Sequence, residues 1–137
     1  MDTEELVETF ELLGDWEERY RYLIELGRQL PPYPEAERDD AHQVRGCISQ
    51  VWLTHRVEDG RLQLMGDSDA HIVRGLVALL LGLTSGRRPQ EILALDLAAI
   101  FERLGLGSHL SANRRNGFFS MVERIRGLAQ SLQAAGR

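Results

Sequence analysis

Apolar residues recur at helical spacing in two runs near the start of the chain, residues 4–13 and 16–30. Each run has one apolar face with the period of an amphipathic helix. Asp15 precedes the second run, and Glu18 lies three residues after it, which is the spacing of a capping box. The stretch PPYPEAERDD, residues 31–40, ends the second run because proline cannot continue a helical hydrogen-bond ladder. The pattern predicts two helices followed by a charged loop.

The period changes from helical to extended at Val44. Apolar and polar residues alternate over residues 51–57 and again over 61–65, with the turn sequence EDG between the two runs. This arrangement predicts a β-hairpin. HQVRG, residues 42–46, is expected to form a short strand or an approach segment beside it, and GDSD, residues 66–69, is expected to end the second strand.

Helical periodicity returns after the hairpin. Residues 72–83 are the most apolar stretch of the chain and predict its most buried helix. Pro89 suits a first helical position, residues 90–105 predict one or two short helices, and a final helix is expected from about Asn113. The predicted fold class is α+β, a small antiparallel β-sheet with helices packed on one face.

Length and composition indicate one globular domain, residues 1–137, with 43% hydrophobic and 27% charged residues. The longest apolar stretch, residues 72–83, contains Arg74 and is too short to cross a bilayer. The N-terminus is acidic where a signal peptide would be basic and then apolar, which predicts a cytoplasmic protein.

The charged residues exclude several classes of function. A net charge of −5 disfavours nonspecific binding to nucleic acid, which requires clustered cations. All 16 basic residues are arginine, so neither a lysine Schiff base nor a phosphate-binding P-loop lysine is possible. The single cysteine, Cys47, excludes an internal disulfide, a CxxC redox pair and a cysteine-rich metal cage.

Cys47 follows Gly46 at the start of the predicted hairpin. Glycine favours a tight bend that leaves a thiol accessible, and the nearby Arg45 and Arg56 favour the thiolate, which is the attacking form. Free cysteine is also among the most often buried residue types. The residues alone leave a reactive role and a packed core role equally open.

The other titratable residues carry weaker signals. The four histidines lack metal-site spacing, although His42 is a conceivable base for Cys47. A side-chain oxygen of Asp67 or Ser68 is expected to cap the buried helix. RRNG, residues 114–117, places two cations at the positive end of the last helix, which indicates either a partner anion or a solvated helix start.

Four ordered motifs, which together extend over most of the chain, are similar to those of the SufE/CsdE family of sulfur-acceptor proteins. They are YLIELGRQLPPYP at 22–34, VRGCISQVW at 44–52, GDSDAHIVRGL at 66–76 and SHLSANRRNG at 108–117. The resemblance implies a fold like that of U-type cluster scaffolds, and a role with cysteine desulfurases in iron–sulfur cluster assembly.

The resemblance further implies that Cys47 accepts a sulfane sulfur as a persulfide and stimulates the partner desulfurase, a pyridoxal-phosphate enzyme. Gly46, Asp67 and Arg114 match positions around the thiol or at the partner surface. The sulfur would then pass to a cluster-assembly scaffold or another acceptor, and this chain would need no cofactor or metal of its own. The family's usual proline is Ala112 here, and its small polar residue is replaced by Arg115.

In the family, the cysteine loop shelters the thiol in an apolar pocket when the protein is free and exposes it on docking. The resemblance therefore implies the same two states for Cys47. The alternatives are a cluster or metal scaffold on the same fold and an unreactive interaction domain. The scaffold lacks ligands in this sequence, because such sites usually need three or four.

Overall fold

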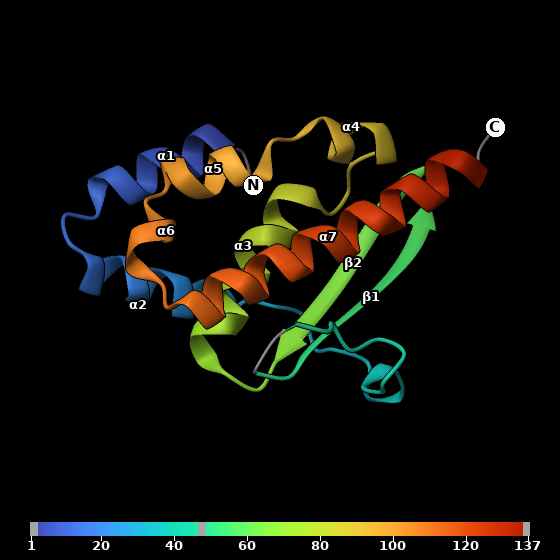
Figure 1. Ribbon diagram of the computed structural model, residues 1–137, viewed down its shortest axis with the longest axis horizontal. Coiled ribbons are helices and arrows are strands. Elements are labelled where there is room, and N and C mark those ends of the chain that lie inside the picture. The colour runs from blue at the N-terminus through green and yellow to red at the C-terminus, as the bar shows by residue number, and fades with distance from the viewer. Residues whose placement is uncertain (1–2, 47–48, 136–137) are drawn as a thin grey trace.

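The computed structural model describes residues 3–46 and 49–135 (Figure 1). Its elements in chain order are α1 (Thr3–Leu12), α2 (Trp16–Arg28), the 3-10 helix η1 (Glu35–Glu37), β1 (Val51–Glu58), β2 (Arg61–Ser68), α3 (His71–Thr84), α4 (Pro89–Ala94), α5 (Leu97–Arg103), α6 (Leu106–His109) and α7 (Ala112–Ala135). This is an α+β fold with a two-stranded antiparallel sheet, so the predicted fold class is confirmed.

The sheet is extended by a short third segment next to β1. Val44 N donates to Val51 O at 2.8 Å, and Leu53 N donates to His42 O at 2.9 Å. The predicted approach segment therefore pairs with the first strand. Residues 45–50, which we call the Cys47 loop, connect this segment to β1.

The buried helix α3 lies at the centre of the molecule (Figure 1). It packs on β2, α2 packs on α3, and α7 packs on both α3 and α4. The crossing of α2 and α3 is close enough to require glycine, because a Cβ at Gly75 would lie 2.2 Å from Leu23 O. As the apolar pattern predicts, α3 is buried along most of its length.

Alternate residues of the hairpin face opposite sides of the sheet. Val51 and Leu53 of β1 and Leu62 and Leu64 of β2 are buried in the core. The intervening residues lie on the outer face, where Trp52 is directly opposite Asp67 in the antiparallel register. The segment before the Cys47 loop contacts this outer face through Arg38, whose guanidinium carbon lies 5.0 Å from the Trp52 ring centroid.

Two local predictions at the second strand are wrong. GDSD does not stop the strand at Met65, because β2 continues through Gly66 and Asp67 and ends at Ser68, inside GDSD. Nor does Asp67 or Ser68 cap the next helix: the N-cap of α3 is Ala70, with no side-chain cap hydrogen bond. As a strand residue, Asp67 points its carboxylate to the outer face, toward Arg38, rather than to the helix.

Candidate functional site

The Cys47 loop contacts other elements at both ends, at residues the sequence alone did not connect. At its start Gly46 adjoins Ser120 of α7. At its end Gln50 N donates to Asp69 Oδ1 at 3.1 Å, and Asp69 N donates to Gln50 O at 3.3 Å. Cys47 and Ile48 lie outside the described residues.

Gly46 is required by both conformation and space. Its φ of +88° lies in the left-handed region, a backbone conformation that is strained for any residue with a side chain. A Cβ on Gly46 would also lie 2.5 Å from Ser120 Oγ. The expected bend before Cys47 is therefore present, and it packs against α7.

We expect Gly46→Ala to destabilise the protein more than Gly86→Ala does. Both positions have positive φ, +88° and +84°, so each alanine incurs strain of about 1–2 kcal/mol. Only at position 46 would the alanine Cβ also clash with a neighbour, because nothing lies within 4 Å of a Cβ at Gly86. Chemical denaturation measures the difference, and adding Ser120→Ala to Gly46→Ala should recover it. Equal losses in the two single variants would contradict this contact.

A cavity of about 360 Å³ opens beside the Cys47 loop, with Ser49 in its wall. Its other lining residues come from α3, from the turn before α7 and from the first turns of α7: Val73, Leu76, Ser111, Asn113, Arg114, Gly117, Phe118 and Met121. The apolar members are buried, whereas Ser111, Asn113 and Arg114 are exposed at the rim. The structure thus brings the Cys47 loop and Arg114 to one partly apolar cavity.

Asp67 does not line this cavity, and its side chain is on the outer face of the sheet. Its Oδ2 accepts a hydrogen bond from Arg38 Nη2 at 2.7 Å. Its Oδ1 accepts one from Ser68 N at 2.8 Å and lies 2.9 Å from Arg74 Nε. Arg74 Nε is not aligned for a hydrogen bond with any described residue, so its contact with Asp67 is an ion pair only. Asp67 therefore joins three segments through two arginines.

His42 faces the carboxylates of its own segment. Its Nδ1 lies 2.6 Å from Asp39 Oδ1, and its Nε2 lies 3.8 Å from Glu37 Oε1. The side-chain hydrogen bond from His42 holds the pKa of Asp39 below its usual value. Both ring nitrogens of His42 thus have carboxylate neighbours, which gives no support to a role as base for Cys47.

Neither Arg38 nor Ser120 is marked by a sequence pattern. Arg38 stands in a stretch of mixed charges that is typical of a solvated loop, and Ser120 lies in the middle of a helix. Only the tertiary contacts mark them.

Over residues 3–46 and 49–135, no group of three or more His, Cys, Asp or Glu residues is placed to hold a metal ion. None of the described helices has the length and hydropathy to span a membrane.

Comparison with known proteins gives a consistent result. Residues 4–129 match the family model described as SufE, Fe-S metabolism associated domain. A SufE-like protein of Rhizobium meliloti (strain 1021) is 49% identical over 131 residues, covering 93% of this chain and 94% of the relative. A SufE-like protein of Rhizobium etli is 50% identical over 136 residues, covering 96% of this chain and 92% of the relative.

The solution structure of a hypothetical protein from Thermus thermophilus has the same fold, with a TM-score of 0.79 at 21% identity and 96% of each chain covered. Its low identity restricts this comparison to the fold. The family model and the two relatives carry the assignment, and the resemblance seen in the motifs is confirmed: the chain belongs to the SufE family, whose domain is associated with Fe–S metabolism.

Proposed function

We propose that this protein accepts a sulfane sulfur on Cys47 from a cysteine desulfurase, stimulates that enzyme and relays the sulfur for iron–sulfur cluster assembly. In this proposal it works in the cytoplasm, and the next acceptor is a cluster-assembly scaffold or another sulfur carrier. The observation that carries the proposal is the Cys47 loop, which holds the only cysteine of the chain, packs against α7 at its start, is hydrogen-bonded to Asp69 at its end and adjoins a cavity shared with Arg114.

The transfer is a thiol–persulfide exchange. The Cys47 thiolate attacks the terminal sulfur of the desulfurase persulfide, forming a new S–S bond on Cys47 while the old S–S bond breaks. The desulfurase cysteine leaves as a thiolate and later takes up a proton, which replaces the one that Cys47 lost to solvent. The number of electrons is conserved, so the step needs no oxidant or reductant.

The surroundings of the loop suit this chemistry. Arg45 is exposed at the first position of the loop, and Arg114 is exposed at the cavity rim. Cations near a thiol favour the thiolate, and Arg114 also suits a role at the partner surface. The chain contains no lysine, so the pyridoxal phosphate that cleaves cysteine belongs to the partner.

We also propose that the cavity shelters Cys47 in the free protein and releases it on docking. The apolar wall formed by Val73, Leu76, Phe118 and Met121 is suited to receive a small side chain. Shelter protects a thiol from oxidation and a persulfide from stray thiols. A docked desulfurase that binds the open loop more tightly would shift the population toward it.

Mass spectrometry tests the acceptor role. After incubation with a pyridoxal-phosphate cysteine desulfurase and cysteine, Cys47 should carry one or more extra sulfur atoms, because its thiolate attacks the donor persulfide. A reductant should remove them, since a persulfide is reducible and a thioether is not. An unmodified Cys47 under turnover would rule out the proposed function.

Elemental analysis distinguishes this role from that of a cluster or metal scaffold. We expect purified protein to hold no stoichiometric zinc or iron, because one cysteine supplies too few ligands for a closed site. Protein purified with and without a chelator should give the same result. Tightly held metal at one ion per chain would favour the scaffold.

A further inference from the structure

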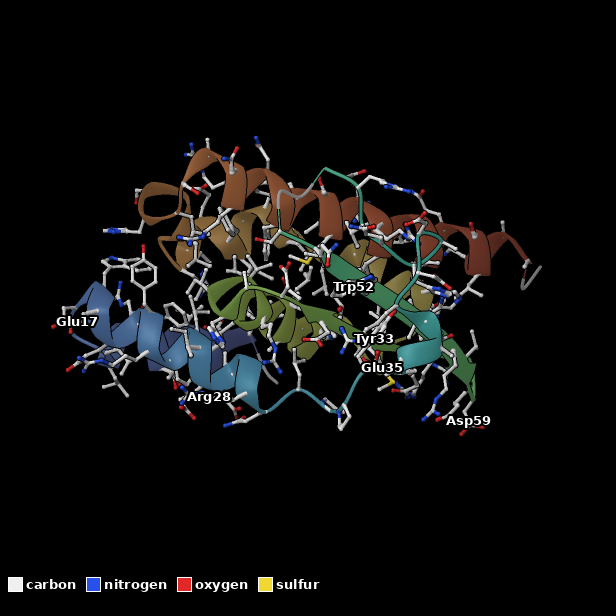
Figure 2. All side chains as sticks on the ribbon, turned by 90° about the horizontal axis from the view of Figure 1, so that it is seen from below. Glu17, Arg28, Tyr33, Glu35, Trp52 and Asp59 are labelled. Carbon is white, nitrogen blue, oxygen red and sulfur yellow. The ribbon has the colours of Figure 1, made fainter. Side chains whose placement is uncertain are left out.

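Arg38 connects the segment after α2 to the outer face of the sheet. Its Nε donates to Glu35 Oε1 at 2.9 Å, and its Nη2 donates to Asp67 Oδ2 at 2.7 Å. Figure 2 shows Tyr33 and Glu35 close to Trp52 on the same side of the molecule. Arg38 thus interacts with its own segment and with both strands.

Two aromatic rings complete the contacts of the Arg38 guanidinium. Its central carbon lies 5.2 Å from the Tyr33 ring centroid and 5.0 Å from that of Trp52, within the range of cation–π attraction. Burial, together with the nearby Glu37 and Asp39 carboxylates, raises the pKa of Tyr33 to about 12, so its ring stays neutral. The hydrogen bond with Asp67 also raises the pKa of Arg38. The guanidinium is therefore a fixed cation between two neutral rings and a carboxylate.

The residues that Arg38 contacts lie at the base of the Cys47 loop. Trp52 immediately follows Val51, whose hydrogen bond with Val44 closes the loop. Trp52 also pairs with Gln43, which precedes the loop. Asp67 is opposite Trp52 in the sheet and lies two residues before Asp69, which holds Gln50. Arg38 thus touches the cross-strand pair that lies next to the closure of the loop at Val51 and next to its contact with Asp69.

We propose that Arg38 is a positioning residue for sulfur transfer, fixing the base of the Cys47 loop through Trp52 and Asp67. This inference rests on the proposed function of Cys47. Arg38 does not contact the reacting sulfur in this role; it acts through the strand pair. The planar guanidinium satisfies ring stacking and carboxylate pairing together, which a lysine ammonium cannot do.

Alkylation of Cys47 in the free protein tests whether Arg38 holds the loop. Arg38→Gln should react roughly tenfold faster than the parent, because loss of a charge-assisted hydrogen bond makes local opening easier. The alkylation rate of Arg38→Lys should lie between those two rates, since lysine keeps the positive charge but lacks the planar guanidinium that stacks on the rings. Arg21→Gln is the matched control, because Arg21 pairs with Glu17 on the exposed side of α2. Its rate should equal that of the parent.

The pH profile of alkylation separates positioning from an effect on the thiol itself. In Arg38→Gln the rate should rise at every pH while the midpoint of the profile stays at the parent value. Combining Arg38→Gln with Asp67→Asn should give less than the product of the two single effects, because the residues act through one contact. A shifted midpoint, fully multiplicative effects, or parent-like rates in Arg38→Gln would overturn the inference.

Sulfur uptake from a pyridoxal-phosphate cysteine desulfurase supplies the functional measurement. Arg38→Gln should lower the maximal uptake rate several-fold, while its unfolding midpoint shows that the variant is folded at the assay temperature. An unchanged uptake rate would refute a positioning role. A parent protein that takes up no sulfur counts instead against the proposed function, and the alkylation rates still decide whether Arg38 holds the loop.

Discussion

Cys47→Ser should abolish both sulfur uptake and stimulation of the desulfurase. A serine hydroxyl is far less acidic than a thiol and forms no persulfide, so the nucleophile is lost with little change in volume. Desulfurase turnover with the variant should fall to the rate measured without this protein. Sulfide release from cysteine, with and without the variant, measures the effect, and an unfolding curve close to that of the parent shows that the fold is intact.

Ser49 offers a matched control within the same loop. Ser49→Ala keeps the thiol and should retain stimulation, although Ser49 lines the cavity. The double variant Cys47→Ser with Ser49→Cys restores a thiol two positions away and should remain inactive if position matters. Stimulation by Cys47→Ser at the parent level would move the function to another part of the chain.

Asp67→Arg should loosen the Cys47 loop and speed alkylation of Cys47 in the free protein. The substitution leaves Arg38 and Arg74 without their shared carboxylate and adds a third cation between them. Breaking a largely buried ion pair costs about 3 kcal/mol, so denaturation should also show a marked loss of stability. Asp67 is an ion-paired strand residue and not a helix cap, so the effect is expected through the sheet.

Glu8→Arg controls for the change in net charge, because Glu8 is exposed on α1. It should leave the alkylation rate unchanged. In complex with the desulfurase, Asp67→Arg should differ less from the parent, because in the proposed switch docking already opens the loop. Equal alkylation rates for the free parent, the free variant and the complex would show a thiol that is exposed throughout, and the proposed switch would be abandoned.

Local sequence patterns predicted the elements of the fold well. The capping box at Asp15 is observed in part. Asp15 Oδ1 accepts a hydrogen bond from Glu18 N at 2.9 Å, but the Glu18 carboxylate accepts one from Gly14 N instead of from Asp15 N. The hairpin and the buried α3 also follow the predicted pattern. Such features depend on residues a few positions apart, whose spacing the sequence displays directly. The end of β2 was missed because turn residues such as those of GDSD also occur in a paired strand.

Residue patterns alone were enough to predict an α+β protein with the motifs of the SufE family and one cysteine, Cys47, inside one of those motifs. The roles of Cys47, Gly46, Asp67 and Arg114 remain predictions. The folded structure was needed to place Gly46 against Ser120, Arg114 at the cavity beside the loop, and Asp67 between Arg38 and Arg74. These contacts join residues 7 to 74 positions apart along the chain. Which side chains meet across such distances depends on how the helices and strands pack, and local periodicity carries no information about it.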